Sequence, residues 1–292
     1  MASHESPTTW HDERAVRITG GRGLEAVVVP ERGAKIASLR DGSGQEWLAQ
    51  PGPELPPPAR GPVRFTDAEM CGWDECAPNV DPDELAGEAL ADHGEVWSKP
   101  WTREVEGGFG SAGTVLPYEL ARDIVPTSGG LRLEYRATAT GDERVPFMWA
   151  AHPQFSAGTG ARILLPPQVQ QVRGVYGVDA RQEWSEQLWD VDALPDGEAL
   201  KFWAEDDALP AWAVLERSDG SRLRLSWDPD LVPYLALWVD AGLFSRERVV
   251  ALEPSTGGRE ALSRALADGC AQHLEPGRRV SWWIDLEVTP PA

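Results

Sequence analysis

The segment Arg248-Val-Val-Ala-Leu-Glu-Pro-Ser-Thr-Gly257 joins an unbroken apolar run to one acid and a proline. The run is typical of a strand covered on both faces, although a buried helical segment would give the same pattern. Pro254 cannot donate a hydrogen bond to a sheet, so the element is expected to end there. Glu253 therefore lies where a buried strand meets a loop, and burial would raise the pKa of its carboxyl group. Such a group suits general acid–base catalysis, and a strand-end glutamate facing water is the alternative.

Short strand-like runs separated by turn residues recur along the chain. The 292 residues include 29 glycines and 25 prolines, which fall between the apolar runs. Arg222–Trp227 alternates as a half-exposed antiparallel strand does, and Asp41-Gly-Ser-Gly44 is typical of a hairpin turn. Helical spacing occurs only in Arg259–Asp268. Many short strands with few short helices predict an all-β fold, a sandwich or a barrel.

Residues 1–292 are expected to form a single domain, because no change of composition marks a boundary. Residues 1–13 are expected to be flexible. Strands are expected at Val16–Thr19, Leu24–Val29, Ala34–Arg40, Gln45–Ala49, Leu131–Thr138, Phe147–Ala151, Ala161–Leu165, Gln171–Tyr176, Ala211–Leu215, Arg222–Trp227, Tyr234–Val239, Val249–Glu253 and Val280–Val288.

The composition argues against several classes of partner. Lys and Arg number 27 against 47 Asp and Glu, which gives a net charge of −20. A surface this acidic repels phosphate backbones and anionic lipids, so neither nucleic acid nor membrane is expected as a partner. The N-terminus has no basic stretch followed by an apolar one, and no run approaches the roughly 18 apolar residues of a membrane span. Cys71, Cys76 and Cys270 cannot all pair and lack zinc spacing, so a cytoplasmic protein with reduced thiols is expected.

Two histidines stand in contexts that suit catalysis. His152 ends the apolar run Phe147–Ala151 and precedes Pro153, so its context matches that of Glu253. His93 lies in Ala91-Asp-His-Gly-Glu-Val-Trp97, where Gly94 allows a tight turn. Either histidine, taken alone, could equally be a structural residue with satisfied hydrogen bonds.

The segment Cys71-Gly-Trp-Asp-Glu-Cys-Ala-Pro-Asn79 is interpreted as a loop that brings Trp73, Asp74 and Glu75 together. Aromatic faces stack on sugar rings, and carboxylates bind hydroxyl groups, so the mixture suits a sugar site. A turn with solvated acids is the alternative. Trp97 and Trp238 are candidate walls of the same pocket, and Asp240 is a further candidate for substrate binding.

Four motifs, in this order along the chain, resemble those of the aldose 1-epimerase (galactose mutarotase) family. They are the Gly72-Trp73 loop ending at Pro78, His93-Gly94 followed by Trp101, His152-Pro153-Gln154-Phe155, and Glu253-Pro254. The early hairpin, Gly33–Leu39 followed by Asp41–Trp47, is also similar to the family's opening. The resemblance covers roughly residues 15–290. Each motif is short, and their order and spacing carry the resemblance.

The resemblance implies a large antiparallel β-sandwich of the galactose mutarotase-like kind, with a sugar cleft on its concave face. It implies catalysis without a metal or another cofactor, and a small sugar as partner of a monomer or homodimer. By position, Glu253 resembles the catalytic base and His152 the general acid. His93 resembles the histidine that binds and polarises the sugar. The chain departs from the family at Trp97, where many relatives have an arginine.

Three other functions remain open from the residues. A glycoside-cleaving enzyme would need a second carboxylate, Asp74 or Glu75, opposite Glu253. A sugar-binding protein would keep the tryptophans without a catalytic pair. A metal enzyme would use two histidines and one carboxylate. The sugar is also open, including whether it carries a phosphate that Arg32, Arg64 or Arg259 would bind.

Overall fold

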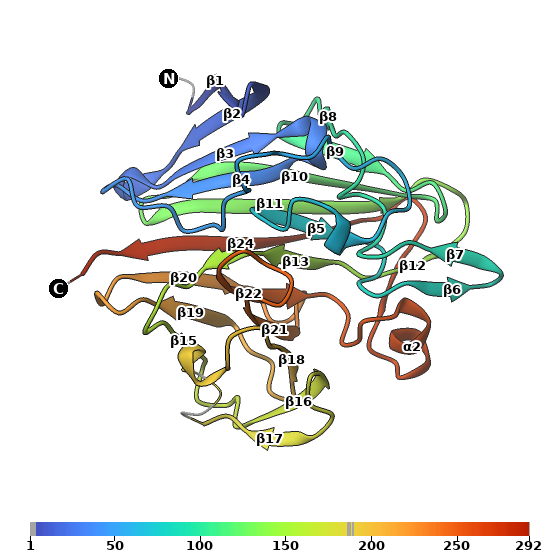
Figure 1. Cartoon of the computed structure of the whole chain (residues 1–292). Coiled ribbons are helices and arrows are strands. Elements are labelled where there is room, and N and C mark those ends of the chain that lie inside the picture. The colour runs from blue at the N-terminus through green and yellow to red at the C-terminus, as the bar shows by residue number, and fades with distance from the viewer. Residues whose placement is uncertain (1–3, 186–187, 189, 292) are drawn as a thin grey trace.

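The computed structural model describes residues 4–185, 188 and 190–291, and within them two large antiparallel sheets pack face to face (Figure 1). The larger sheet has 12 strands in the described residues, with β14 (Phe155–Ser156) paired to β22 beside the main path. The main path runs β1 (Glu5–Trp10), β2 (Glu13–Thr19), β3 (Glu25–Val29), β4 (Lys35–Arg40), β5 (Trp73–Cys76), β13 (Ala150–Pro153), β22 (Arg248–Ser255), β21 (Tyr234–Ala241), β18 (Ala199–Ala204), β16 (Gln171–Tyr176) and β17 (Arg181–Glu183).

The second sheet has eight strands in the same part of the chain, and β24, β11 and β10 form its long centre (Figure 1). Its order is β15 (Arg162–Leu164), β19 (Trp212–Glu216), β20 (Arg222–Trp227), β24 (Arg279–Thr289), β11 (Gly130–Ala139), β10 (Tyr118–Pro126), β9 (Phe109–Ala112) and β8 (Thr102–Arg103). The expected all-β sandwich is therefore confirmed.

Short elements lie around the sandwich. Strands β6 (Asp83–Leu85) and β7 (Glu88–Leu90) form a hairpin beside helix α2 (Leu262–Ala267), at the right of Figure 1. Ser263 ties the two together, because its backbone N–H and its hydroxyl both donate to Asp83. Strand β12 (Val145–Phe147) pairs with β23 (Gln272–Leu274). Single 3-10 turns occur at η1 (Gly21–Gly23), η2 (Pro30–Arg32), η3 (Phe65–Asp67) and η4 (Val191–Ala193).

Alternation along the central strands separates the core from the outer face of the larger sheet. In β22, Val250 and Leu252 belong to the core that both sheets share. Because successive side chains of a strand point to opposite faces, Ala251 and Glu253 lie on the outer face. The same alternation places the other polar side chains of β5, β13 and β18, described below.

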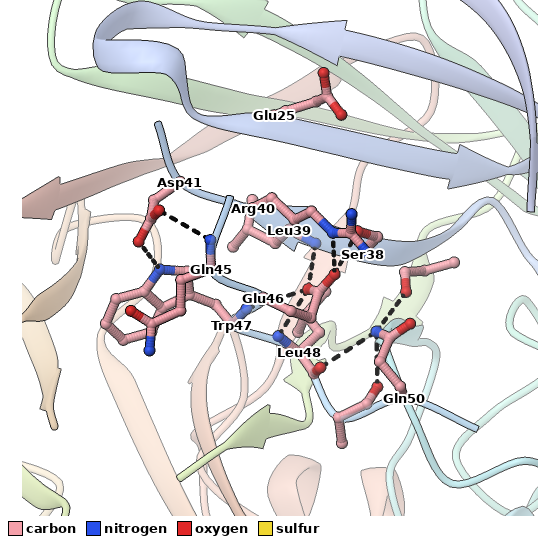
Figure 2. Close-up of polar contacts among 12 residues, drawn as sticks. Glu25, Ser38, Leu39, Arg40, Asp41, Gln45, Glu46, Trp47, Leu48 and Gln50 are labelled. Carbon is pink, nitrogen blue, oxygen red and sulfur yellow. Dashed lines mark hydrogen bonds and ion pairs between the residues drawn. The ribbon is translucent and has the colours of Figure 1, made fainter. Parts of the chain in front are cut away.

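All expected strands except Gln45–Ala49 overlap a strand of the structure, and the expected helix is confirmed over Leu262–Ala267. The Asp41–Gly44 turn is present, but residues 45–49 make only isolated bridges, through Glu46 and Leu48. Figure 2 shows the reason: the Glu46 carboxylate accepts the backbone N–H groups of Leu39 and Leu48, at 2.8 and 3.1 Å. These groups pair with a side chain rather than with a neighbouring strand.

Three other expectations need correction. The strand expected to end at Pro254 continues to Ser255, because both residues remain paired with β21. Residues 73–76, expected in a loop, form β5 inside the larger sheet, because Trp73–Cys76 is buried between β4 and β13. The N-terminal segment expected to be flexible includes β1, which pairs along its whole length with β2. Tyr118–Pro126 and Ala199–Ala204 are strands that the sequence pattern did not reveal.

Candidate active site

Ionisable side chains form a row across the outer face of the larger sheet. The row contains, in strand order, Lys35 of β4, Asp74 of β5, His152 of β13, Glu253 of β22 and Lys201 of β18. All five are buried, at 0 to 8% exposure. Buried charges are normally paired. The partners of each group therefore distinguish the side chains with a structural role from those that are available to a ligand.

Glu253 and His152 approach each other at the centre of this row. Glu253 Oε1 lies 3.8 Å from His152 Nε2. Oε2 of the same carboxylate lies 3.0 Å from Lys201 Nζ. Glu253 Oε1 and His152 Nδ1 are buried and have no hydrogen-bond partner among the described residues. A buried oxygen with unused acceptor capacity is costly, and it is the atom that a bound hydroxyl group could satisfy.

The environment shifts the pKa values of Glu253 and His152 in opposite directions. Burial raises the pKa of Glu253, and the neighbouring Lys201 opposes this increase. Burial lowers the pKa of His152 well below its usual range, and His93 and Lys201 lower it further. His152 is therefore uncharged at neutral pH. Opposed shifts within one cluster are characteristic of acid–base sites.

Lys201 is held on both sides by carboxylates. Its ammonium group lies 3.0 Å from Glu253 and 3.0 Å from Glu260, whose other oxygen accepts the indole N–H of Trp203 at 2.6 Å. Burial alone would lower the pKa of Lys201, but the two carboxylates outweigh burial and raise it. Lys201 therefore stays charged and fixes one oxygen of Glu253. The sequence analysis missed this group because β18 was not recognised; its alternation of Lys201 and Trp203 with Leu200 and Phe202 was the available signal.

A loop places His93 over the site. His93 and Gly94 have positive φ angles of 58° and 73°, so the expected tight turn is present. His93 Nδ1 donates to Asp92 at 2.8 Å, and the other oxygen of Asp92 accepts the backbone N–H of Phe65 at 2.7 Å. Burial would raise the pKa of Asp92, but these hydrogen bonds outweigh it and lower the pKa. With Nδ1 committed to Asp92, Nε2 is the nitrogen available to a ligand.

Aromatic contacts then connect this loop to His152. The ring of Phe65 stacks on His93 with centroids 4.1 Å apart, and the rings of His93 and His152 lie 5.0 Å apart, edge to face. Trp97 contacts the edge of Phe65 and donates its indole N–H to the carbonyl of Asp92 at 2.9 Å. The sequence analysis named His93 and His152, whose rings lie side by side here, while Phe65 and Asp92 were not anticipated.

These side chains border a pocket of about 230 Å³. Its polar lining includes His93, His152, Lys201 and Glu260, together with Arg64, Thr66, Asp81 and Asp92. Glu253 contacts His152 and Lys201. Its apolar lining includes Phe65, Tyr176, Trp238 and Phe244. A pocket that joins a few convergent polar groups to aromatic walls is the usual form of a small-molecule site. Trp238, a candidate pocket wall in the sequence analysis, is among the residues that line this pocket.

The other predicted substrate-binding residues have internal partners. Trp73 is fully buried in the core and meets Phe155 edge to face. Asp74 pairs with the ammonium group of Lys35, and burial raises its pKa to about 6 against the effect of that cation. Asp74 is the cross-strand neighbour of His152. It therefore borders the site without lining the pocket in the described residues.

Glu75 and Asp240 also have internal partners. Glu75 points to the opposite side of β5 and pairs with Arg122 in the core, and it accepts further hydrogen bonds from Tyr135 and Trp149 at 3.1 and 2.8 Å. The carboxylate of Asp240 accepts backbone N–H groups of residues 242–245. Asp240 thereby organises the turn that carries Phe244 rather than facing the pocket.

Two other features are absent from the part of the chain that the structure describes. No group of three or more His, Cys, Asp and Glu side chains is placed to hold a metal ion. Among the helices within residues 4–291 that the structure describes, none has the length and apolar character needed to cross a membrane.

The fold matches that of several solved structures at low sequence identity. A galactose mutarotase-like protein from Lactobacillus casei shares 17% identity, with a TM-score of 0.70 over 94% of this chain and 100% of that one. A candidate aldose 1-epimerase from Klebsiella pneumoniae shares 16%, with a TM-score of 0.74 over 98% and 83% of the two chains. The Slr1438 protein from Synechocystis shares 19%, with a TM-score of 0.72 over 99% of both.

No protein-family model and no curated protein matches the chain. The solved structures therefore place it in one structural class, that of galactose mutarotase-like folds. Within this class the chain is divergent, since its identity to the solved structures described above is 16 to 19%.

Proposed function

We propose that the chain is a cytoplasmic aldose 1-epimerase that interconverts the α and β anomers of a sugar by acid–base ring opening. The observation that carries the proposal is the pair Glu253 and His152, 3.8 Å apart beside the pocket, with one oxygen of Glu253 unused in the described residues. The fold neighbours described as mutarotases and aldose 1-epimerases support it. The cysteines Cys71, Cys76 and Cys270 are free and buried, as expected of reduced thiols.

The chemistry needs one base and one acid. Glu253 takes the proton of the anomeric hydroxyl group, the C1–O bond of the ring breaks, and His152 gives a proton to the ring oxygen. The open aldehyde rotates about C1–C2, and ring closure returns both protons and gives the other anomer. Both carboxylate and imidazole end in their starting protonation states.

The surroundings of Glu253 and His152 favour these proton transfers. Lys201 holds Glu253 Oε2 at 3.0 Å, which favours the ionised carboxylate and leaves Oε1 for the sugar. His93, fixed through Asp92, presents Nε2 to a sugar oxygen. The depressed pKa of His152 makes its protonated form a strong but scarce acid.

Cleavage of a glycosidic bond has weaker support. It requires two carboxylates that flank the bond. Glu75 points into the core on the other side of the sheet, and Asp74 is paired with Lys35. Neither carboxylate faces Glu253 across the pocket.

Polarimetry of freshly dissolved α-D-glucose and α-D-galactose tests the proposal. We expect equilibration to be faster with the protein than in buffer, and Glu253→Gln to remove most of the acceleration. Wild-type rates in the Gln variant would reject Glu253 as the base. If the wild-type protein accelerates neither sugar nor any other aldose of a panel, the proposed reaction is wrong, and calorimetry on the same panel then tests for sugar binding without catalysis.

A further inference from the structure

Asp74 is a fully buried carboxylate that the proposed reaction leaves without a role. It lies in β5, directly opposite His152 of the neighbouring strand β13. Directly opposite residues of an antiparallel pair share one face of the sheet, with Cβ atoms about 4.5–5.5 Å apart. The side chains of Asp74 and His152 are therefore neighbours on the outer face of the larger sheet.

Each of these two side chains has one polar atom without a partner in the described part of the chain. Lys35 binds Oδ2 of Asp74, whereas Oδ1 is buried and unpartnered. Nε2 of His152 lies 3.8 Å from Glu253 Oε1, whereas Nδ1 is buried and unpartnered. A buried polar atom without a partner is costly, and a hydrogen bond from Nδ1–H to Oδ1 would satisfy both atoms.

His152 lies between two lysine–carboxylate pairs of the same kind. On one side Lys201 binds Oε2 of Glu253, and on the other side Lys35 binds Oδ2 of Asp74. In both pairs the second carboxylate oxygen has no partner among the residues that the structure describes. The two nitrogens of His152 thus have two carboxylates beside them, each with one oxygen available.

The charges around Asp74 keep its carboxylate ionised at neutral pH. Burial raises the pKa of Asp74 to about 6, and Lys35 limits the increase. Burial alone would lower the pKa of Lys35, but Asp74 and Glu69 outweigh burial and raise it. Lys35 lies 3.5 Å from Glu69, which in turn lies 3.2 Å from Arg32. The carboxylate of Asp74 is therefore held by a fixed cation and can accept a hydrogen bond at its second oxygen.

His152 needs such an acceptor if it is to act as an acid. Burial, His93, Lys201 and Lys35 all lower its pKa, so its protonated form is disfavoured. A protonated imidazole donates from both nitrogens. When Nε2–H is given to the sugar, Nδ1–H still requires an acceptor. A carboxylate at that nitrogen fixes the tautomer, orients the ring and stabilises the charged form.

We infer that Asp74 is a positioning residue that accepts the Nδ1–H of His152 and so supports protonation at Nε2; this inference rests on the proposed role of His152 as the acid. The proton on Nδ1 stays in place throughout the reaction. The proton on Nε2 passes to the ring oxygen and returns when the ring closes. Asp74 acts only through His152, which agrees with its place beside the pocket rather than in its lining.

Nitrogen-15 NMR of histidine-labelled protein tests the contact, with the signals of His152 assigned through His152→Gln. At neutral pH, where His152 is uncharged, we expect the wild type to carry the ring proton on Nδ1. Asp74→Asn should shift the population toward the Nε2–H tautomer, because a neutral amide is a weaker acceptor than a carboxylate. Lys35→Met/Asp74→Leu removes the acceptor together with its cation, so no unpaired charge is left buried, and it should abolish the preference for Nδ1.

Glu75→Gln is the matched control, because Glu75 is equally buried on the same strand and pairs with Arg122 on the other face. It should keep the wild-type tautomer. The same tautomer of His152 in all four proteins would overturn the inference.

Kinetics of the same variants then test the role in catalysis. A charge-assisted hydrogen bond is worth about 10- to 100-fold in an equilibrium, so kcat of Lys35→Met/Asp74→Leu should fall by that factor. KM should change by less than about twofold, since the contact supports the acid rather than sugar binding. An altered tautomer with wild-type kcat would overturn the positioning role.

The NMR measurement needs no sugar, so it separates this inference from the proposed function. A tautomer that depends on Asp74, in a wild-type protein without mutarotase activity, would reject the proposed function and support the contact. An active wild type whose His152 tautomer does not respond to either Asp74 variant would support the function and reject the inference.

Discussion

Glu75 and Glu253 are buried carboxylates of the larger sheet, on strands β5 and β22 that lie on either side of β13. Glu75 points into the core, where Arg122 and Tyr135 share one oxygen and Trp149 bonds the other. Glu253 points to the outer face, where Lys201 takes one oxygen and the other has no partner in the described part of the chain. Both oxygens of Glu75 have hydrogen-bond partners, whereas one oxygen of Glu253 can still accept a hydrogen bond from a ligand.

The contrast shows which property identifies a reactive acid. Burial raises the pKa of both carboxyl groups, and a neighbouring cation opposes the increase in each case, Arg122 for Glu75 and Lys201 for Glu253. A raised pKa therefore does not distinguish them. The unused oxygen does, since buried polar groups without partners are rare and need an explanation. His152, 3.8 Å away and also with an unpartnered nitrogen among the described residues, supplies that explanation.

Glu253→Gln is expected to have the largest effect on activity. A proton-transfer group is typically worth about 10²–10⁴-fold, so kcat should fall within that range. Stability should change by no more than about 1 kcal/mol, because Lys201 keeps Glu260 as a partner. Polarimetry and urea unfolding of the same preparation measure both quantities. A large stability loss in this variant would mean that Glu253 is structural, as Glu75 is.

Glu75→Gln should have the opposite profile. The substitution leaves Arg122 as a buried cation without its carboxylate, which costs about 3–5 kcal/mol. Activity per folded molecule should be unchanged, because Glu75 faces away from the pocket. Urea unfolding measures the first effect, and kinetics normalised to the folded fraction measure the second. Loss of activity in fully folded Glu75→Gln protein would contradict the separation of the two faces.

Lys201→Met tests how the reactive carboxylate is kept ionised. Without the ammonium group, the pKa of Glu253 should rise further, because burial is then opposed by less positive charge. Lys201 also lowers the pKa of His152, so the whole kcat/KM profile should move to higher pH, by about one pH unit for each unit by which the two pKa values rise. Lys201→Arg should restore most of the profile. Lys99→Met is the control, since Lys99 pairs with Glu95 outside the pocket. An unshifted acid limb in Lys201→Met would remove Lys201 from the mechanism.

The proposed pair of His152 and Glu253 could be selected from the sequence because its signals are local. An apolar run, an ionisable residue and a proline are all visible within a few positions at both His152 and Glu253. The same reasoning misplaced residues 73–76, because four buried positions that include two acids do not resemble a strand. Asp74 and Glu75 are tolerated there only through Lys35 and Arg122, which lie 39 and 47 residues away. Partners at such distances follow from the fold and leave no local pattern.

The ion pairs that Lys201 makes with Glu253 and Glu260 could not be predicted from the sequence, for a similar reason. Lys201 and Glu260 are 59 residues apart, and each is unremarkable in its own segment. The pocket residue Tyr176 depends on a bulge in β16, which changes the direction of side chains without a fixed sequence signature. Sequence patterns therefore indicated which strands carry the candidate site residues, while the supporting charges and the position of Tyr176 became visible only with the sheet register.

The smallest expected effect is on the pH profile of Glu75→Gln, which should match that of the wild type. Under the proposed mechanism, kcat/KM of the wild type requires ionised Glu253 and protonated His152. The pKa of Glu253 is raised and that of His152 is well below its usual range, so the two limbs move together. The result is a bell-shaped profile whose apparent pKa values belong to the pair.

Glu75 titrates on the other face of the sheet, so its removal should leave both limbs in place, even though it lowers the free energy of unfolding. The comparison needs pH profiles of both proteins at a temperature where the variant is folded, with circular dichroism recorded at each pH. A displaced limb in folded Glu75→Gln protein would show that the charge of Glu75, on the inner face of the sheet, changes the pKa of a group in the site. Coinciding profiles would establish that the pleat of β5 isolates a structural acid from the reactive one two strands away.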